Sequence, residues 1–449
     1  MSFPRYAAYK DSGVEWLGEV PQGWAVAPLK RSYSVSLGKM LQPELSSPND
    51  TFLPYLRAAN IQWAGVDISD VKSMWFSEKE KQHLSLRKND LLISEGGDVG
   101  RSAIWHNELE YCYFQNSINR VRAKNNNVTK YLYYWIYAVK DKGYIDILCN
   151  KSTIAHFTAE KVAAIPMPLP TTEEQTTIAA FLDCETAKID NLINEQKKLI
   201  ELLKEKRQAV ISTAVTKGLN PHAPMKDSGV EWLGEVPEHW SVVPLKYFTN
   251  FSGGGTPSRD NLAYWNGDIP WVSPKDMKVE RINNTEEYIT EHGLKNSSSS
   301  LITSGQILIV VRSGILKHTI PVAINDIPVT LNQDMKALCF NKSFCINSFF
   351  FRWVQGLNEV LLLAWAKQGA TVESIEHNYL AETLIPLPPI EEQSTIVAFL
   401  DQETAKIDNL IQQAQKATTL LQERRTALIS AAVTGKIDVR NKSLPASLS

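Results

Sequence analysis

The chain has 449 residues, too many for one ordinary hydrophobic core, so its length predicts roughly two to four domains. It is 43% hydrophobic and 21% charged, a composition that excludes a disordered or fibrous chain. The formal net charge of −2 excludes a protein that coats nucleic acid through bulk positive charge. Any DNA binding must therefore be organised locally.

Cysteine usage and hydropathy indicate a cytoplasmic protein. The five cysteines are widely separated and form no C-x-x-C pair, which favours reduced thiols over a zinc site or a redox dithiol. No apolar leader region opens the sequence, and no stretch reaches the roughly 18 uninterrupted apolar residues that a membrane span requires.

Two stretches of the chain each occur twice. KDSGVEWLGEVPQGWAVAPLK at 10–30 returns at 226–246 with 17 of 21 positions identical, and the 21 residues from 173 return from 391 with three differences. The intervening stretches 25–165 and 241–385 share a skeleton but little sequence: 54–61 aligns with 270–277, and 91–93 with 307–309. This tandem duplication is typical of two similar domains that recognise different ligands, although a duplicated enzyme or structural protein also fits it.

A long helix is predicted after each variable stretch. The first starts at a capping box, Thr172 to Gln175, and meets no glycine or proline before Gly218. At 1.5 Å per residue, 173–216 would be about 66 Å long. The predicted heptad seams contain Leu182, Ile189, Leu192, Leu199, Leu203 and Val210 in the first helix and Leu400, Ile407, Leu410, Leu421 and Leu428 in the second. We expect the helices to pair antiparallel, with the variable domains at opposite ends; the alternative is that they cross a large core.

Motifs of catalysis are missing from the sequence. It has no G-x-x-x-x-G-K-[ST] phosphate loop and no G-x-G-x-x-G after a strand. The glycine-rich run 251–256 is followed by Pro257 rather than by the helix that a methyl-donor site needs. The eight histidines include no H-E-x-x-H pair, so no metal site is expected.

The duplicated SGVEWLGEVP openings, the IP-x-P exits that lead to EEQ and the long helices together resemble the specificity subunits of type I restriction-modification systems over nearly the whole chain. The second exit, IPLPPIEEQ, is two residues shorter than the first, so the start of the second helix is less sharply defined. The resemblance implies a non-catalytic subunit in which each variable domain reads one half of a bipartite DNA target. It also implies two modification subunits and two restriction subunits as partners, which carry S-adenosylmethionine, ATP and Mg, with no cofactor on this chain.

The expected fold is α+β: two globular α/β target recognition domains joined by two long antiparallel helices in a pseudo-two-fold tandem repeat. The expected parts are a first recognition domain at 1–165, a central region with a spacer helix at 166–225, a second recognition domain at 226–385, and a C-terminal region with a spacer helix and tail at 386–449.

Candidate DNA-contacting residues lie in polar or glycine-rich stretches, because arginine, lysine, asparagine and glutamine suit phosphates and base edges. Residues 26–165 hold 18 Lys and Arg against 14 Asp and Glu, whereas 242–385 hold 12 against 13, so more phosphate contacts are expected from the first domain. The first-domain candidates are Arg57, Asn60, Gln62, Gly96, Gly97, Arg101, Gln115, Asn116, Arg120 and Arg122. The second-domain candidates are Thr256, Ser258, Arg259, Lys275, Asp276, Arg312, Lys317, Asn332 and Gln333.

Simpler interpretations stand beside these candidates. An ordinary tight hairpin explains the glycines at 96–100 equally well, and Trp265 and Trp271 are expected to be core aromatics rather than stacking partners for bases. Two other functions also stay open: a self-contained DNA methyltransferase or nuclease with unrecognisable motifs, and a coiled-coil scaffold that binds only proteins.

Overall fold

The structure is a computed structural model that describes residues 3–149, 156–367, 369 and 371–441. It forms two compact units: unit 1 is Met1–Gln196 with Lys416–Ser449, and unit 2 is Lys197–Gln415. Each unit therefore contains one variable stretch and a part of both long helices. The last residues of the predicted tail, 442–449, lie outside the described residues.

The globular part of unit 1 alternates short strands and helices. Its strands are β1 (Tyr9–Asp11), β2 (Glu19–Pro21), β3 (Ala25–Pro28), β4 (Tyr33–Leu37), β5 (Thr51–Leu56), β6 (Ile61–Gln62), β7 (Gly65–Val66), β8 (Lys72–Phe76), β9 (Leu91–Ser94), β10 (Ser102–Ile104), β11 (Tyr113–Phe114), β12 (Ile118–Ala123) and β13 (Pro166–Leu169). Its helices are η1 (Leu29–Arg31), η2 (Ala58–Asn60), α1 (Glu78–Leu84), α2 (Thr129–Asp141), α3 (Tyr144–Leu148) and α4 (Ala159–Ala164).

Unit 2 has a similar, though not identical, order of elements. Its strands are β14 (Met225–Asp227), β15 (Glu235–Pro237), β16 (Ser241–Pro244), β17 (Thr249–Gly253), β18 (Trp265–Val272), β19 (Arg281–Ile282), β20 (Glu287–Ile289), β21 (Ile307–Val310), β22 (Val322–Asn325), β23 (Thr330–Leu331), β24 (Met335–Phe340) and β25 (Leu384–Leu387). Its helices are η3 (Leu245–Tyr247), η4 (Leu262–Tyr264), α6 (Glu291–Lys295), η5 (Gly314–Lys317), α7 (Asn347–Gly356), α8 (Asn358–Trp365) and α9 (His377–Glu382).

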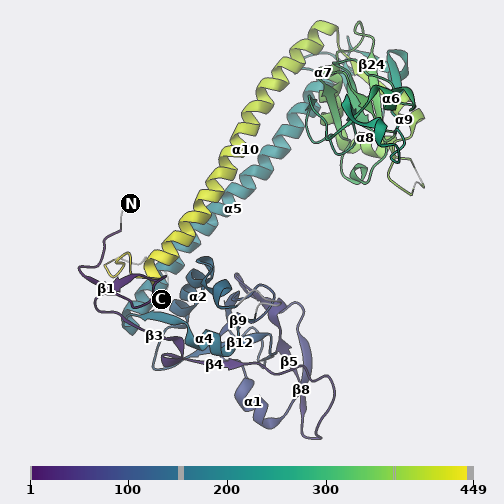
Figure 1. The fold of residues 1–449 in the computed structure, drawn as a ribbon. Coiled ribbons are helices and arrows are strands. Elements are labelled where there is room, and N and C mark those ends of the chain that lie inside the picture. The colour runs from purple at the N-terminus through teal and green to yellow at the C-terminus, as the bar shows by residue number, and fades with distance from the viewer. Residues whose placement is uncertain (1–2, 150–155, 368, 370, 442–449) are drawn as a thin grey trace. The chain divides into compact units, whose positions relative to one another are not determined.

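The two variable domains have matching sheets despite their different sequences. The order β10-β9-β12-β4 in unit 1 corresponds to β22-β21-β24-β17 in unit 2, where β19 adds an edge strand. Figure 1 labels β4, β9 and β12 of the first of these sheets and β24 of the second. A three-stranded sheet centres on β5 in unit 1 and on β18 in unit 2, each with one parallel and one antiparallel neighbour. The predicted alignments of 54–61 with 270–277 and of 91–93 with 307–309 are therefore confirmed.

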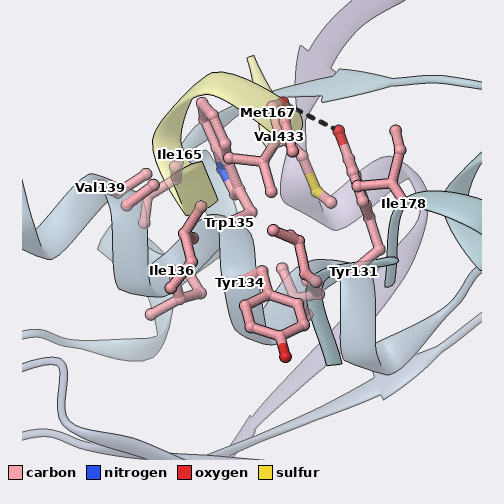
Figure 2. Close-up of a cluster of buried hydrophobic side chains, with 14 of the residues drawn as sticks. Tyr131, Tyr134, Trp135, Ile136, Val139, Ile165, Met167, Ile178 and Val433 are labelled. Carbon is pink, nitrogen blue, oxygen red and sulfur yellow. Dashed lines mark hydrogen bonds between the residues drawn. The ribbon is translucent and has the colours of Figure 1, made fainter. Parts of the chain in front are cut away.

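In each unit, a helix that carries a buried tryptophan joins the variable domain to the long helices. Trp135 of α2 and Trp353 of α7 occupy equivalent positions in the two units, and both are fully buried. Tyr131 donates its hydroxyl hydrogen bond to the carbonyl of Val433 at 3.2 Å or of Pro168 at 3.0 Å, among the apolar side chains shown in Figure 2. Burial of such large aromatic side chains is the main source of stabilisation at this contact.

The two long helices are α5 (Thr172–Lys217) and α10 (Ile390–Val433). In unit 1, Arg440 beyond the end of α10 approaches Glu174 near the start of α5, and Arg425 pairs with Asp190 at 2.8 Å. The helix segments of unit 1 are therefore antiparallel, as predicted. In unit 2, Arg207 of α5 pairs with Asp408 of α10 at 2.9 Å, and both of these residues are the duplicated equivalents of the unit 1 pair.

The residue that caps α5 differs from the predicted one. Thr171, rather than Thr172, accepts a hydrogen bond from the Glu174 backbone N–H at 3.3 Å. Thr172 already lies inside the helix, because the capping side chain must precede the first helical residue.

Three of the eleven predicted seam residues were wrong. Leu192, Leu199 and Leu410 are 50%, 43% and 49% exposed, whereas their neighbours Ile193 and Ile200 are buried. The predicted and observed heptad seams share every seventh residue and differ only in the second seam position of each heptad. The shared residues are therefore buried as expected: Leu182, Ile189, Leu203, Leu400, Ile407 and Leu428. Val210 and Leu421 are half-buried. At the second seam position of the observed heptads, threonine or arginine interrupts the apolar pattern. These interruptions made the buried face of each helix harder to recognise from the sequence.

Candidate DNA interface

Three loops of the first variable domain meet at one edge. The Arg101 guanidinium donates to the Ala58 carbonyl at 3.1 Å, and the Ala58 N–H donates to the Ser117 hydroxyl at 3.1 Å. The Glu95 N–H donates to the Ser117 carbonyl at 2.9 Å. The predicted stretches 57–62, 95–101 and 115–117 therefore form one composite surface, which we call the first loop surface.

Several first-domain candidates leave side-chain donors accessible on this surface. Arg57 forms an ion pair with Asp70 and keeps a third of its side chain exposed. Lys72 and Arg57 beside Asp70 lower the pKa of that carboxyl group. The Gln62 side chain donates to the Ala59 carbonyl of its own loop at 2.9 Å.

The turn beside it contributes backbone as well as side chains. Gly97 has φ +69° and open space around it, and Gly96 is half-buried, so a ligand has room to approach this backbone. Gln115 and Asn116 are half-buried in the next loop.

Three first-domain candidates are instead engaged inside the protein. Asn60 is buried and bonds to the carbonyls of Asp67 and Asp70 at 2.8 and 3.1 Å. Arg122 forms two 2.7 Å bonds to the carboxylate of Asp90. Arg120 is buried against backbone carbonyls, and this burial lowers its pKa to about 10. These three side chains hold loops and strands in place.

The loops of the second domain also converge. Gly255 donates its N–H to the Leu331 carbonyl at 2.8 Å, and Asn332 donates its N–H to the Val272 carbonyl at 2.9 Å. Thr256 bonds to Gln333, so these two candidates lie together. Arg312 lies beside the same loops, because its Nε donates a hydrogen bond to the Asp334 carboxylate at 2.6 Å. We call this the second loop surface.

Arg259 is the most highly organised candidate of the second domain. Its guanidinium lies 3.9 Å from the centroid of the Trp265 ring, and Glu287 holds it with two hydrogen bonds. Hydrogen bonding from Arg259, together with its charge, lowers the pKa of Glu287. Trp265 and Trp271 are buried, which confirms that they are core aromatics.

The remaining second-domain candidates fall into two groups. Ser258, Lys275 and Lys317 are exposed. Asp276 and Asn332 are engaged internally: Asp276 accepts from the Ser273 hydroxyl at 2.9 Å and the Glu286 N–H at 2.8 Å, and the Asn332 side chain accepts from the Asp334 N–H at 2.9 Å.

Sequence reasoning missed Gly38, which supports the first loop surface. A Cβ at Gly38 would lie 2.2 Å from the carbonyl oxygen of Gln115, and one at Gly254 would lie 1.9 Å from that of Asn332. The two glycines are equivalent, because each follows its own copy of the duplicated opening at the same distance. Glycine at the same place in two otherwise divergent stretches was the signal that could have revealed this close backbone crossing.

Among the residues that the structure describes, no group of three or more His, Cys, Asp or Glu side chains is placed to hold a metal ion. No helix in the described part of the chain is long and apolar enough to cross a membrane.

Comparison with known proteins identifies the class. The family model for the type I restriction modification DNA specificity domain matches twice, at residues 36–202 and 237–418. The chain therefore belongs to the family of type I restriction-modification specificity subunits, which are DNA target-recognition subunits and not the catalytic ones.

Individual relatives support this membership. The chain is 33% identical over 285 residues to the EcoR124I/EcoR124II specificity subunit of Escherichia coli, an alignment covering 62% of this chain and 63% of that protein. It is 25% identical to the putative MjaX specificity subunit of Methanocaldococcus jannaschii, over 94% of this chain and 96% of the relative.

Solved structures share the fold. A chain from a study of complex assembly and conformational transition of the type I R-M system has a TM-score of 0.71 at 16% identity, covering 92% of this chain and 98% of its own. The HsdS subunit from Thermoanaerobacter tengcongensis has a TM-score of 0.57 at 17% identity, covering 93% and 98%.

Proposed function

We propose that this chain selects a bipartite DNA target, with one loop surface reading each half-site. The observation that carries the proposal is that one duplicated scaffold presents two loop surfaces with different exposed side chains. Duplex DNA is read by donors and acceptors directed at base edges, and different side-chain sets select different sequences. The domain boundaries predicted from the sequence, 1–165 and 226–385, are our proposal for the two reading modules.

Candidates with accessible side chains are proposed to touch DNA, while the engaged ones shape the loops. On the first surface the proposed contacts are Arg57, Gln62, Arg101, Gln115 and Asn116, with Gly96 and Gly97 allowing close approach. On the second they are Thr256, Ser258, Arg259, Lys275, Arg312, Lys317 and Gln333. Arg259 is the strongest candidate for a base contact, because stacking and a carboxylate partner fix the guanidinium before DNA arrives.

We propose that two modification subunits dock on the long helices. Unit 1 exposes Leu192 and Leu420 by 50% and 54%, and unit 2 exposes their equivalents Leu410 and Leu202 by 49% and 52%. Exposed leucines at duplicated positions support two equal docking faces for two copies of one partner. Two restriction subunits complete the proposed cytoplasmic complex, in which the partners carry S-adenosylmethionine, ATP and Mg.

Selection from a random DNA library tests the proposal directly. The purified complex of this chain with its modification subunit should enrich a motif of two short specific parts separated by an unspecified gap. Arg259→Ala should alter only one part of that motif and leave the other unchanged. Enrichment of no motif by a demonstrably assembled complex would favour a protein-binding scaffold, and methylation or cleavage by the chain alone would favour a self-contained enzyme.

A further inference from the structure

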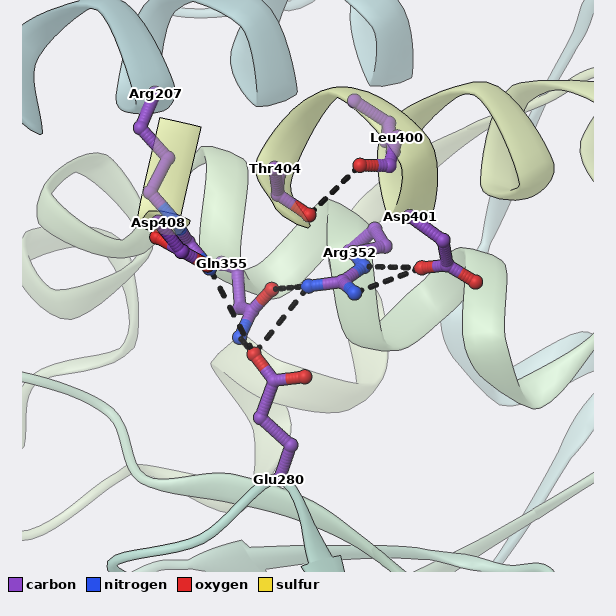
Figure 3. A network of polar contacts seen from close by, with 8 residues as sticks. All are labelled: Arg207, Glu280, Arg352, Gln355, Leu400, Asp401, Thr404 and Asp408. Carbon is purple, nitrogen blue, oxygen red and sulfur yellow. Dashed lines mark hydrogen bonds and ion pairs between the residues drawn. The ribbon is translucent and has the colours of Figure 1, made fainter. Parts of the chain in front are cut away.

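A buried arginine lies where the second variable domain meets the long helices. Arg352 of α7 is 8% exposed, and its guanidinium donates to Asp401 of α10 at 2.7 and 3.2 Å. The same guanidinium donates to the side-chain oxygen of Gln355 at 2.8 Å and to Glu280 at 3.3 Å (Figure 3). One side chain thus connects a domain helix, a domain loop and a long helix.

The network also reaches the other long helix. Glu280 accepts a hydrogen bond from Gln355 at 2.9 Å and lies 3.9 Å from the guanidinium of Arg207 in α5. Arg207 in turn pairs with Asp408 of α10. We call Glu280, Arg352 and Gln355, with Arg207, Asp401 and Asp408, the ionic joint.

The corresponding joint of unit 1 has the same helix side chains but a different domain side. By the duplication, Asp183, Asp190 and Arg425 are the equivalents of Asp401, Asp408 and Arg207. Where unit 2 has Arg352, unit 1 has Tyr134, whose buried hydroxyl donates to Asp183 at 2.7 Å.

Aromatic contacts complete the unit 1 joint. Tyr137, the equivalent of Gln355, packs against Trp63 with ring centroids 5.1 Å apart, and the Arg425 guanidinium lies 5.3 Å from the Tyr137 ring. On the domain side, Lys130 forms an ion pair with Asp183 at 2.8 Å, at the exposed margin. The domain side of this joint is therefore mainly aromatic, whereas that of unit 2 is ionic.

We propose that Arg352 is a positioning residue for the second recognition domain, fixing its orientation on the long helices and hence the gap accepted between half-sites. This inference rests on the proposed function. Asp401 and Glu280 keep 57% and 48% of their side chains exposed, so salt screens the ionic joint. The aromatic packing in unit 1 is not screened in this way. Salt therefore weakens discrimination between gap lengths, because it loosens the joint of the second domain and not that of the first.

The test compares methylation of the natural target with that of targets whose gap is one base pair longer or shorter. The complex with the modification subunit is assayed at low and high salt, and the ratio of rates removes the general salt dependence of DNA binding. We expect Asp401→Asn to reduce gap discrimination roughly three- to tenfold, in the range of ordinary coupling effects. Arg352→Tyr, which reproduces Tyr134, should make the discrimination insensitive to salt.

Asp183→Asn, the same substitution at the equivalent position, is the matched control and should change gap discrimination less than twofold. The exchanged pair Arg352→Asp with Asp401→Arg should recover discrimination if the single variants lose it through the charge pair rather than through misfolding. Unchanged discrimination in both Asp401→Asn and Arg352→Tyr would overturn the positioning role. A wild-type complex that prefers no gapped target would instead contradict the proposed function itself.

Discussion

Arg122 and Arg259 each bind a carboxylate through two hydrogen bonds, yet their surroundings give them different roles. Arg122 closes over Asp90, whose side chain is 1% exposed, and it therefore compensates a buried charge. Arg259 is paired with Glu287, and more than half of its side chain is exposed. The sequence predicted both as DNA contacts because it shows residue type and not burial, which depends on strands brought together from distant parts of the chain.

Arg122→Ala should destabilise the protein rather than change its DNA target. Removing the guanidinium takes two hydrogen bonds from the buried Asp90 carboxylate and leaves the bond from the Arg87 backbone N–H, a loss of about 3–5 kcal/mol of unfolding free energy. Urea unfolding measures this loss, and Arg87→Ala, at an exposed arginine nearby, is the control that should change stability by less than about 0.5 kcal/mol. A shifted DNA motif with unchanged stability would contradict this assignment.

Alanine substitutions at two adjacent glycines, Gly254→Ala and Gly253→Ala, test the close approach of the backbone at Gly254 to that at Asn332. A Cβ at Gly254 meets the Asn332 carbonyl, whereas one at Gly253 meets nothing within 4 Å. We expect Gly254→Ala to cost about 2 kcal/mol of unfolding free energy through overpacking, and Gly253→Ala to be nearly neutral. Equal effects of the two variants in thermal unfolding would show that the crossing is not close.

At the scale of elements, the sequence predicted the long helices and the matching of strands between the two domains better than the helix faces. The duplication identified β5 with β18 and β9 with β21, because buried strands keep their apolar pattern when their surface changes. The sequence could not distinguish the two possible heptad seams on each long helix. Buried Thr186 and Thr404 interrupt the observed seam, while exposed Leu192 and Leu410 resemble seam residues. Interactions between loops, such as Arg101 with Ala58, depend on tertiary structure and leave no periodic signal.

Neighbouring positions on α5 separate the seam from the proposed docking face. Ile193 is 6% exposed, so Ile193→Ala should lower the unfolding free energy by about 2–3 kcal/mol. Leu192 is 50% exposed, so Leu192→Ala should leave stability nearly unchanged but weaken association with the modification subunit. Sedimentation of the mixed subunits reports the association. If Leu192→Ala unfolds the protein and Ile193→Ala does not, Leu192 rather than Ile193 lies in the helix seam.

At the scale of the whole molecule, we propose that the long helices set the gap between half-sites. Inserting four residues into both α5 and α10 adds one helical turn, about 6 Å. We expect the accepted gap to lengthen by roughly one or two base pairs while both half-sites keep their sequences. The motif enriched from a random library measures both quantities. An unchanged gap in the extended protein would contradict the ruler mechanism.

The most direct test of the role as sequence reader is genome-wide adenine methylation in a host without its own methylation. The host expresses the modification subunit either with this chain or alone. We predict methylation at a single gapped, two-part motif only when this chain is present. Methylation at the same sites without this chain, or at no defined motif when the complex is assembled, would contradict its role as the sequence-reading subunit.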